Sequence, residues 1–173
     1  MRTLGPRSVS SFLKIALDIA YVALAIALVV LGVTALLMAV NMVNPDIMHW
    51  KPRRGYSMTP VGAAARLLIG CLFTLGLMGI VGRLRKIFVT LVAGQPFQLE
   101  NAKRLRIIGL ILAALEASRF GVYALLMWGL QTKPMFLKPD INFTALFGIG
   151  VMFVLAEVFE EGVKMRKEMD LTI

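Results

Sequence analysis

Cysteine and histidine are almost absent from this chain of 173 residues, which holds one of each, Cys71 and His49. A disulfide framework, a cysteine–histidine zinc site and a thiol–imidazole nucleophile pair each need more such residues than one chain supplies. Most of the familiar chemistry of enzymes and metals is therefore excluded. We expect a protein that is not an enzyme, with no catalytic residue, no metal site and no cofactor.

Charged residues are scarce as well, at 17% of the chain against 58% hydrophobic residues. A soluble domain holds roughly a quarter charged residues, because polar side chains must cover its surface. Acidic residues are scarcer than basic ones, with 10 Asp and Glu against 19 Lys and Arg, which gives a net charge of +9. In a membrane protein, such a basic excess indicates which loops face the cytoplasm, and it is not by itself a sign of nucleic-acid binding. The composition predicts an all-α integral membrane protein that makes no direct contact with nucleic acid.

Four apolar runs reach the length of about 20 residues that a helix needs to cross a bilayer. These runs cover residues 15–43, 61–82, 107–130 and 143–159. Extended beyond the bilayer, they predict one domain over residues 1–173 with transmembrane helices at about 12–43, 61–92, 101–130 and 143–168. The first run is longer than the apolar part of a cleaved signal peptide, so we interpret it as an uncleaved anchor.

Lysine and arginine gather on one side of the predicted membrane, twelve against five. The twelve are Arg2, Arg7, Lys14, Arg83, Arg85, Lys86, Lys103, Arg104, Arg106, Lys164, Arg166 and Lys167. The five are Lys51, Arg53, Arg54, Lys133 and Lys138, of which the first three form a cluster against the trend. Cytoplasmic loops retain an excess of Lys and Arg, so both termini are predicted to be cytoplasmic.

Ionisable side chains inside the spans are costly, at about 2.5–3.5 kcal/mol each near a helix centre. We predict an intramembrane polar cluster, whose members are Arg66, Glu116, Arg119 and Tyr123. One interpretation is an ion pair of Glu116 with Arg119 or Arg66 that orients the helices. The other is a polar cavity that binds an ion, a proton or a small amphiphile. Asp18 and Glu157 are predicted to be carboxylates at the inner ends of the first and fourth spans.

Small residues recur every four positions along the third span, at Gly109, Ala113, Ala117 and Gly121. Such a stripe lets two membrane helices approach closely. It predicts tight packing within one four-helix bundle, with a homodimer contact as the alternative.

The second helix is predicted to run on past the bilayer with one apolar stripe, which suits an anionic lipid surface or a partner helix. Gly94 and Pro96 then end this helix. Phe97 is predicted to staple the turn to the next helix, which restarts near Glu100 or Asn101 with a polar side chain as its cap.

Residues 93–109, which read AGQPFQLENAKRLRIIG, resemble the signature segment of a bacterial membrane family catalogued as domain of unknown function 2975. Residues 155–164 and the final DLTI resemble that family's second signature and its usual C-terminus. The resemblance implies a small multi-pass protein of four helices in the bacterial cytoplasmic membrane, without an assigned activity. Genes of this family often lie beside one for a short helix-turn-helix regulator, which implies a cytoplasmic partner. The implied partner-binding residues are Gly94, Pro96, Phe97, Glu100, Asn101, Arg104 and Leu105.

The leading functional hypothesis is a non-enzymatic membrane sensor or anchor that acts on the helix-turn-helix regulator. The alternative is a small transporter or efflux component that uses an intramembrane carboxylate, although no broken helix or inverted repeat supports it. An intramembrane enzyme ranks third, because Asp18, Glu116 and Glu157 have no evident activating partners.

Overall fold

The computed structural model of the chain describes residues 9–43, 60–124, 127 and 140–171. Its four long helices are α1 (Val9–Val43), α2 (Pro60–Val92), α3 (Leu99–Ala124) and α4 (Phe143–Leu171). Each is long and apolar enough to cross a membrane, and the described residues form no strand. The predicted all-α class with four membrane-spanning helices is confirmed. The orientation of the termini stays a prediction, and the predicted end of the third helix at residue 130 lies outside the described residues.

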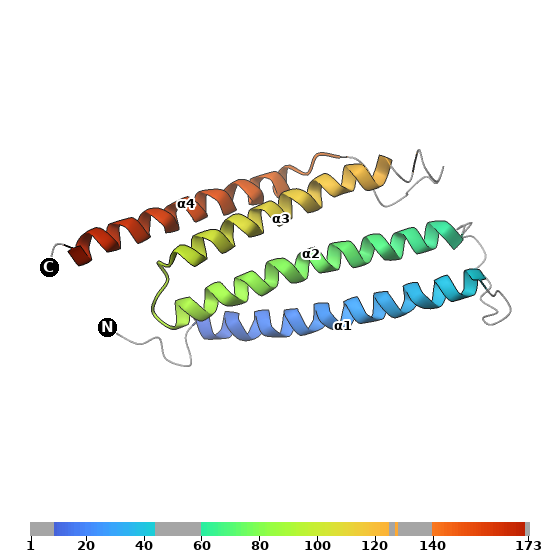
Figure 1. Cartoon of the computed structure of the whole chain (residues 1–173), viewed down its shortest axis with the longest axis horizontal. Helices are drawn as coiled ribbons and strands as arrows, with labels where there is room; N and C mark the ends of the chain where they lie inside the picture. Colours follow the sequence, from blue (N-terminus) through green and yellow to red (C-terminus); the bar gives the residue numbers. More distant parts are fainter. Residues whose placement is uncertain (1–8, 44–59, 125–126, 128–139, 172–173) are drawn as a thin grey trace.

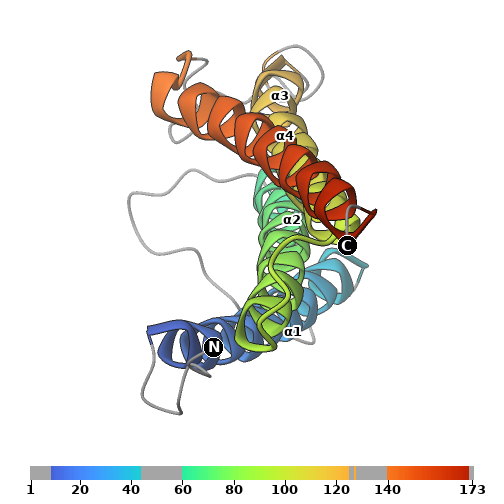
Figure 2. The same cartoon turned by 90° about the vertical axis from the view of Figure 1, so that its left-hand side faces the viewer.

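The four helices form an open succession in which α1 packs on α2, α2 on α3, and α3 on α4. Among the described residues the backbone of α1 does not come close to that of α3 or α4, nor does the backbone of α2 come close to that of α4. Viewed end-on, the helices follow a curve with α1 and α4 at its two edges (Figure 2). The helices therefore do not close into a ring around a common interior.

One end of the molecule carries the beginning of α1, the turn between α2 and α3, and the end of α4 (Figure 1). We call it the basic end, because most of the described lysines and arginines lie near it. Its cations are Lys14, Arg83, Arg85, Lys86, Lys103, Arg104, Arg106, Lys164, Arg166 and Lys167. The start of α1 and the end of α4 therefore lie at the same end of the molecule.

Apolar side chains cover much of the outer surface, and α1 shows this most clearly. Phe12 is 71% exposed and Leu36, near the other end of α1, is 65% exposed. A helix that is apolar on all sides without a protein neighbour is suited to lipid. The hydrocarbon of a bilayer thus replaces the protein core that these side chains would otherwise need.

A small buried cluster joins α2, α3 and α4 in the half of the molecule nearer the basic end. It consists of Ile80, Ile87, Leu105, Ile108 and Ala156, with partly buried neighbours that include Leu84 and Leu91. The apolar stripe on the extension of α2 therefore packs against the chain's own helices. This packing holds the turn between α2 and α3 in a defined position.

Glycine fixes the end of α2. Gly94 has a φ of 74°, a left-handed conformation that L side chains rarely adopt. Its N–H donates to the Leu91 carbonyl at 3.0 Å, and the Gln95 N–H donates to the Thr90 carbonyl at 3.0 Å. These two bonds are those of a Schellman motif, which satisfies carbonyls left free at a helix end. The chain turns here as Gly94 and Pro96 predict.

The predicted cap of α3 is wrong. The helix begins at Leu99, so Asn101 is its third residue and its side chain points elsewhere. A side chain of this kind does cap α4, where Asn142 Oδ1 accepts a hydrogen bond from the Ala145 N–H at 3.2 Å. The physical reason is that the Asn101 side chain donates its hydrogen bonds to Thr90 of α2 and to the Pro96 carbonyl of the turn.

Close helix approach occurs at only part of the small-residue stripe. A Cβ on Gly109 would lie 3.1 Å from Cε2 of Phe153, so the absence of a side chain at Gly109 allows α4 to pack closely against α3. Gly121 has no such neighbour within 4 Å in the described part of the chain. The stripe thus serves packing between α3 and α4 at one end, and the homodimer stays a prediction.

Candidate functional site

The two signature segments of the sequence meet at the basic end. The ring of Phe97 lies 5.8 Å from that of Phe159 on α4, at a tilt of 47°. A Cβ on Gly162 would lie 2.5 Å from Cδ1 of Phe97, so the missing side chain makes room for this ring. Arg106 Nη2 donates to Glu160 Oε2 at 2.7 Å, which ties α3 to α4 beside the rings. The turn, α3 and α4 therefore form one junction.

Asn101 forms the polar centre of this junction and is 0% exposed. Its Nδ2 donates to Thr90 Oγ1 at 2.7 Å and to the Pro96 carbonyl at 2.9 Å. Its Oδ1 accepts a bond from Arg104 Nη1 at 2.8 Å. One side chain thereby joins the last turn of α2, the connection and the first turns of α3. A buried polar group with all its bonds made rigidifies its surroundings.

The seven candidate partner-binding residues divide by exposure. Asn101 and Leu105 are buried and shape the junction from within. Gly94, Phe97 and Glu100 are exposed, and Phe97 shows 43% of its surface. Pro96 and Arg104 are partly buried. A partner at this site would meet the exposed group, held in place by the buried one, and the role of all seven in partner binding stays a prediction.

The predicted intramembrane cluster contains one ion pair within α3. Arg119 Nη1 donates to both carboxylate oxygens of Glu116, at 2.9 and 3.1 Å. The side chain of Glu116 is 15% exposed. Gly76 of α2 faces Leu115, the neighbour of Glu116, and Arg66 lies ten residues before Gly76, or about 15 Å along the helix axis. Tyr123 lies about 10 Å along α3 from Glu116 by the same rise per residue. The structure therefore brings together Glu116 and Arg119, and a ligand cavity beside them stays a prediction.

The two inner-end carboxylates lie apart, on α1 and α4, which are not neighbours in the fold. Asp18 Oδ1 accepts a hydrogen bond from Arg85 Nε of α2 at 2.5 Å. The Arg85 guanidinium also lies over the ring of Tyr21, 4.6 Å from its centroid. Glu157 is exposed on α4 and makes no ion pair within the described ranges. Asp18 is therefore a link between α1 and α2.

Sequence reasoning missed the partners that complete the junction, namely Phe159, Glu160, Gly162 and Thr90. The signal for the first three was the second signature, whose glycine and aromatic residue stand three positions apart on one helix face. Nothing in the sequence indicated that Thr90 would accept a bond from Asn101. In the part of the chain that the structure describes, no three His, Cys, Asp or Glu side chains are grouped as metal ligands.

Comparison with known proteins returned one match. A family model described as Protein of unknown function (DUF2975) matches residues 20–173, which include most of α1 and all of α2, α3 and α4. No curated protein and no solved structure matches the chain. The matched region contains both signature segments, and the resemblance inferred from them is confirmed.

Proposed function

The chain belongs to this family of unknown function, and from that premise we propose that it is a non-enzymatic membrane sensor or anchor acting on a cytosolic helix-turn-helix regulator. The single observation that carries the proposal is the junction at the basic end. Its buried members hold a turn whose exposed members lie beyond the apolar spans, where a protein outside the bilayer has access.

The exposed surface of the junction has a chemistry that a protein partner matches. Phe97 offers an apolar ring, Glu100 a carboxylate, and Lys103 and Arg106 two cations. Aromatic and arginine side chains are favoured at protein interfaces. The cations favour an acidic face on the partner, since complementary charge raises the rate of association and fixes orientation.

Coupling between the membrane and this surface runs through α4. The ring of Phe97 rests on Gly162 and Phe159, so a shift of α4 against α3 moves the ring and the turn with it. A ligand or a bilayer state that changes the packing of α3 and α4 would act on the partner in this way. Such a signal requires different interactions with two arrangements of the helices.

Site-specific photocrosslinking in the membrane tests the proposal. A photoreactive residue at the exposed position of Lys103 is expected to capture a small helix-turn-helix protein encoded in the adjacent reading frame. The same residue at Ile26, which is 61% exposed on α1, is the matched control and should capture none. Phe97→Ala should abolish capture from position 103, because it removes the exposed apolar ring that the partner is proposed to contact.

The alternative, a transporter, makes a different prediction. Both carboxylate oxygens of Glu116 accept bonds from Arg119, so proton or ion transport would have to break this pair. Capture of no regulator at position 103, together with solute flux in vesicles that Glu116→Gln abolishes, would replace the sensor with a transporter. Capture of the regulator without such flux supports the sensor or anchor.

A further inference from the structure

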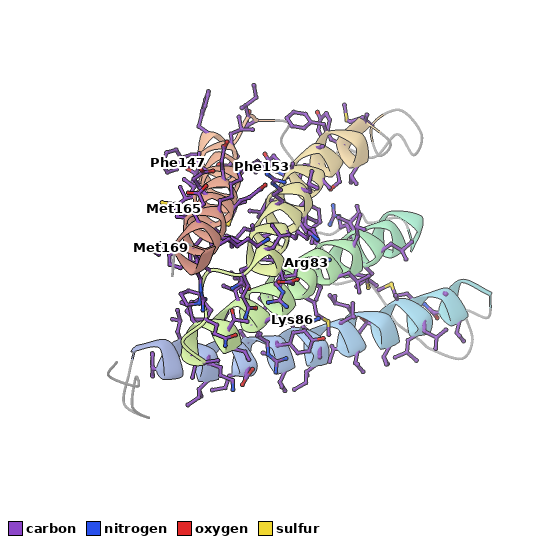
Figure 3. All side chains as sticks on the ribbon, turned by 60° about the vertical axis from the view of Figure 1, so that its left-hand side comes forward. Arg83, Lys86, Phe147, Phe153, Met165 and Met169 are labelled. Carbon is purple, nitrogen blue, oxygen red and sulfur yellow. The ribbon has the colours of Figure 1, made fainter. Side chains whose placement is uncertain are left out.

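A pocket of about 610 Å³ opens at the basic end between α1, α2 and the first turns of α3. Its charged and aromatic lining residues are Lys14, Asp18, Tyr21, Arg85, Lys86 and Arg104, and Thr90 adds a hydroxyl group. Figure 3 shows Lys86 on α2 beside α1. The volume falls within the range of about 300–1,000 Å³ that is usual for small-molecule sites. This pocket shares Thr90 and Arg104 with the junction but none of its exposed residues, so its ligand can be tested without the proposed regulator.

The lining is strongly cationic, with four basic side chains and one carboxylate. Asp18 is bonded to Arg85, which leaves Lys14 and Lys86 without an ion pair among the described residues. Like charges held together at a membrane boundary, where the dielectric is lower than in water, repel one another more strongly. An anion in the pocket would relieve that repulsion.

Two of the cations are held in place before any ligand arrives. Arg85 is fixed by its bond to Asp18 and by the ring of Tyr21 beneath it. Arg104 donates from Nη1 to Asn101 and, at 3.4 Å, to the Lys86 carbonyl, which leaves the rest of its guanidinium free to donate. A guanidinium fork fits the oxygens of a phosphate, and an ordered fork loses less entropy when it binds one.

The position of the pocket along the helices indicates where the anion comes from. Tyr21 lines the pocket, and aromatic side chains of this kind occur at the level of lipid headgroups. Beyond it, α1 continues with apolar side chains that face outward, among them Val22 at 57% and Ile26 at 61% exposure. A single molecule with a phosphate group and acyl chains could bind the cationic pocket with the phosphate and the apolar surface of α1 with the chains.

We propose that this pocket is a binding site for the phosphate headgroup of an anionic membrane phospholipid, with the acyl chains of the lipid lying along α1. Basic pockets between transmembrane helices bind such headgroups through the same charges. Arg85 and Arg104 contact the phosphate oxygens, and Lys14 and Lys86 add to the positive potential that attracts the anionic headgroup.

The test uses the full chain in nanodiscs of zwitterionic lipid doped with an anionic phospholipid. Lipid retained by the protein is measured by native mass spectrometry and by titration of a labelled lipid. The pocket variant is Lys14→Gln with Lys86→Gln. The matched control is Lys103→Gln with Lys167→Gln, which removes two exposed cations near the same end outside the pocket. The pocket variant should bind the anionic lipid about 30-fold more weakly, which corresponds to about 1 kcal/mol for each lysine.

The control should stay within about threefold of the wild type, and equal melting temperatures in uncharged detergent would show that all variants fold. An equal loss in both double variants would overturn the proposal, because general attraction to the surface would then explain binding. Inorganic phosphate supplies the second arm. If it displaces the lipid at equal concentration, the ligand is a soluble phosphate and the lipid assignment is wrong.

Discussion

Replacing Asn101 is the perturbation with the most direct structural consequence. The side chain is fully buried and makes two neutral hydrogen bonds and one to a guanidinium. Neutral bonds contribute about 1 kcal/mol each and bonds to a charged group about 2 kcal/mol. Asn101→Ala should therefore lower the free energy of unfolding by about 4 kcal/mol, with part of the cost due to the Pro96 carbonyl and Arg104 left without their partner.

The substitution Asn101→Asp tests the contribution of the hydrogen bonds without changing the size of the side chain. The aspartate has the same size and still accepts from Arg104, yet it lacks the two N–H donors and places an oxygen against the Pro96 carbonyl. It should be destabilising by at least 2 kcal/mol, because the lost donors leave buried acceptors unpaired. Lys103→Ala, two positions along the helix on its exposed face, is the control and should change stability by less than about 0.5 kcal/mol.

The assay is chemical denaturation in detergent micelles, followed by hydrogen exchange of the backbone amides of residues 94, 95, 97 and 98. Both Asn101 variants should accelerate exchange in this turn more than in the middle of α2. A loss below about 1 kcal/mol in Asn101→Ala, with unchanged exchange in the turn, would refute the view that this side chain holds the junction together.

Two further substitution sets test the helix contacts. Arg119→Ala should leave the Glu116 carboxylate unpaired inside the span and lower stability by about 3 kcal/mol, whereas the double variant Glu116→Ala with Arg119→Ala should regain most of it. Equal losses in the single and the double variant would contradict an ion pair. Gly162→Ala should push Phe97 off α4 and lower the melting temperature. Combined with Phe97→Ala it should cost less than the two changes separately, by about 1 kcal/mol, and strict additivity would show that the two residues do not touch.

The sequence predicts the helices and the turn well, because their causes are local. Four runs of apolar residues have no other stable place than a bilayer or a large core, and the chain is too short to bury them. Gly94 ends α2 because its positive φ suits glycine, and Pro96 follows it. Each of these features depends on residues that are close together in the chain.

The contacts between helices could not be predicted, because they depend on residues that are far apart in the chain. On α1 the apolar residues face all directions, so no periodicity identifies the side that packs on α2. Asp18 pairs with Arg85, 67 positions away in the chain. Asn101 reads locally as a helix cap, and only the three-dimensional position of Thr90 and Pro96 gives its side chain other partners. The open succession of helices likewise depends on long-range packing.

The most direct test of the central claim, that the basic end faces the cytosol, is cysteine labelling with a membrane-impermeant maleimide. Cys71 is the one cysteine of the chain, so Cys71→Ala provides a background without thiols. Into it we would introduce Lys103→Cys at the basic end and, separately, Asp140→Cys, an exposed residue just before α4 at the other end. In intact spheroplasts Asp140→Cys should react and Lys103→Cys should not, and inside-out vesicles should reverse the result. Labelling of Lys103→Cys from outside would place the junction away from the cytosol and contradict the proposed action on a cytosolic regulator.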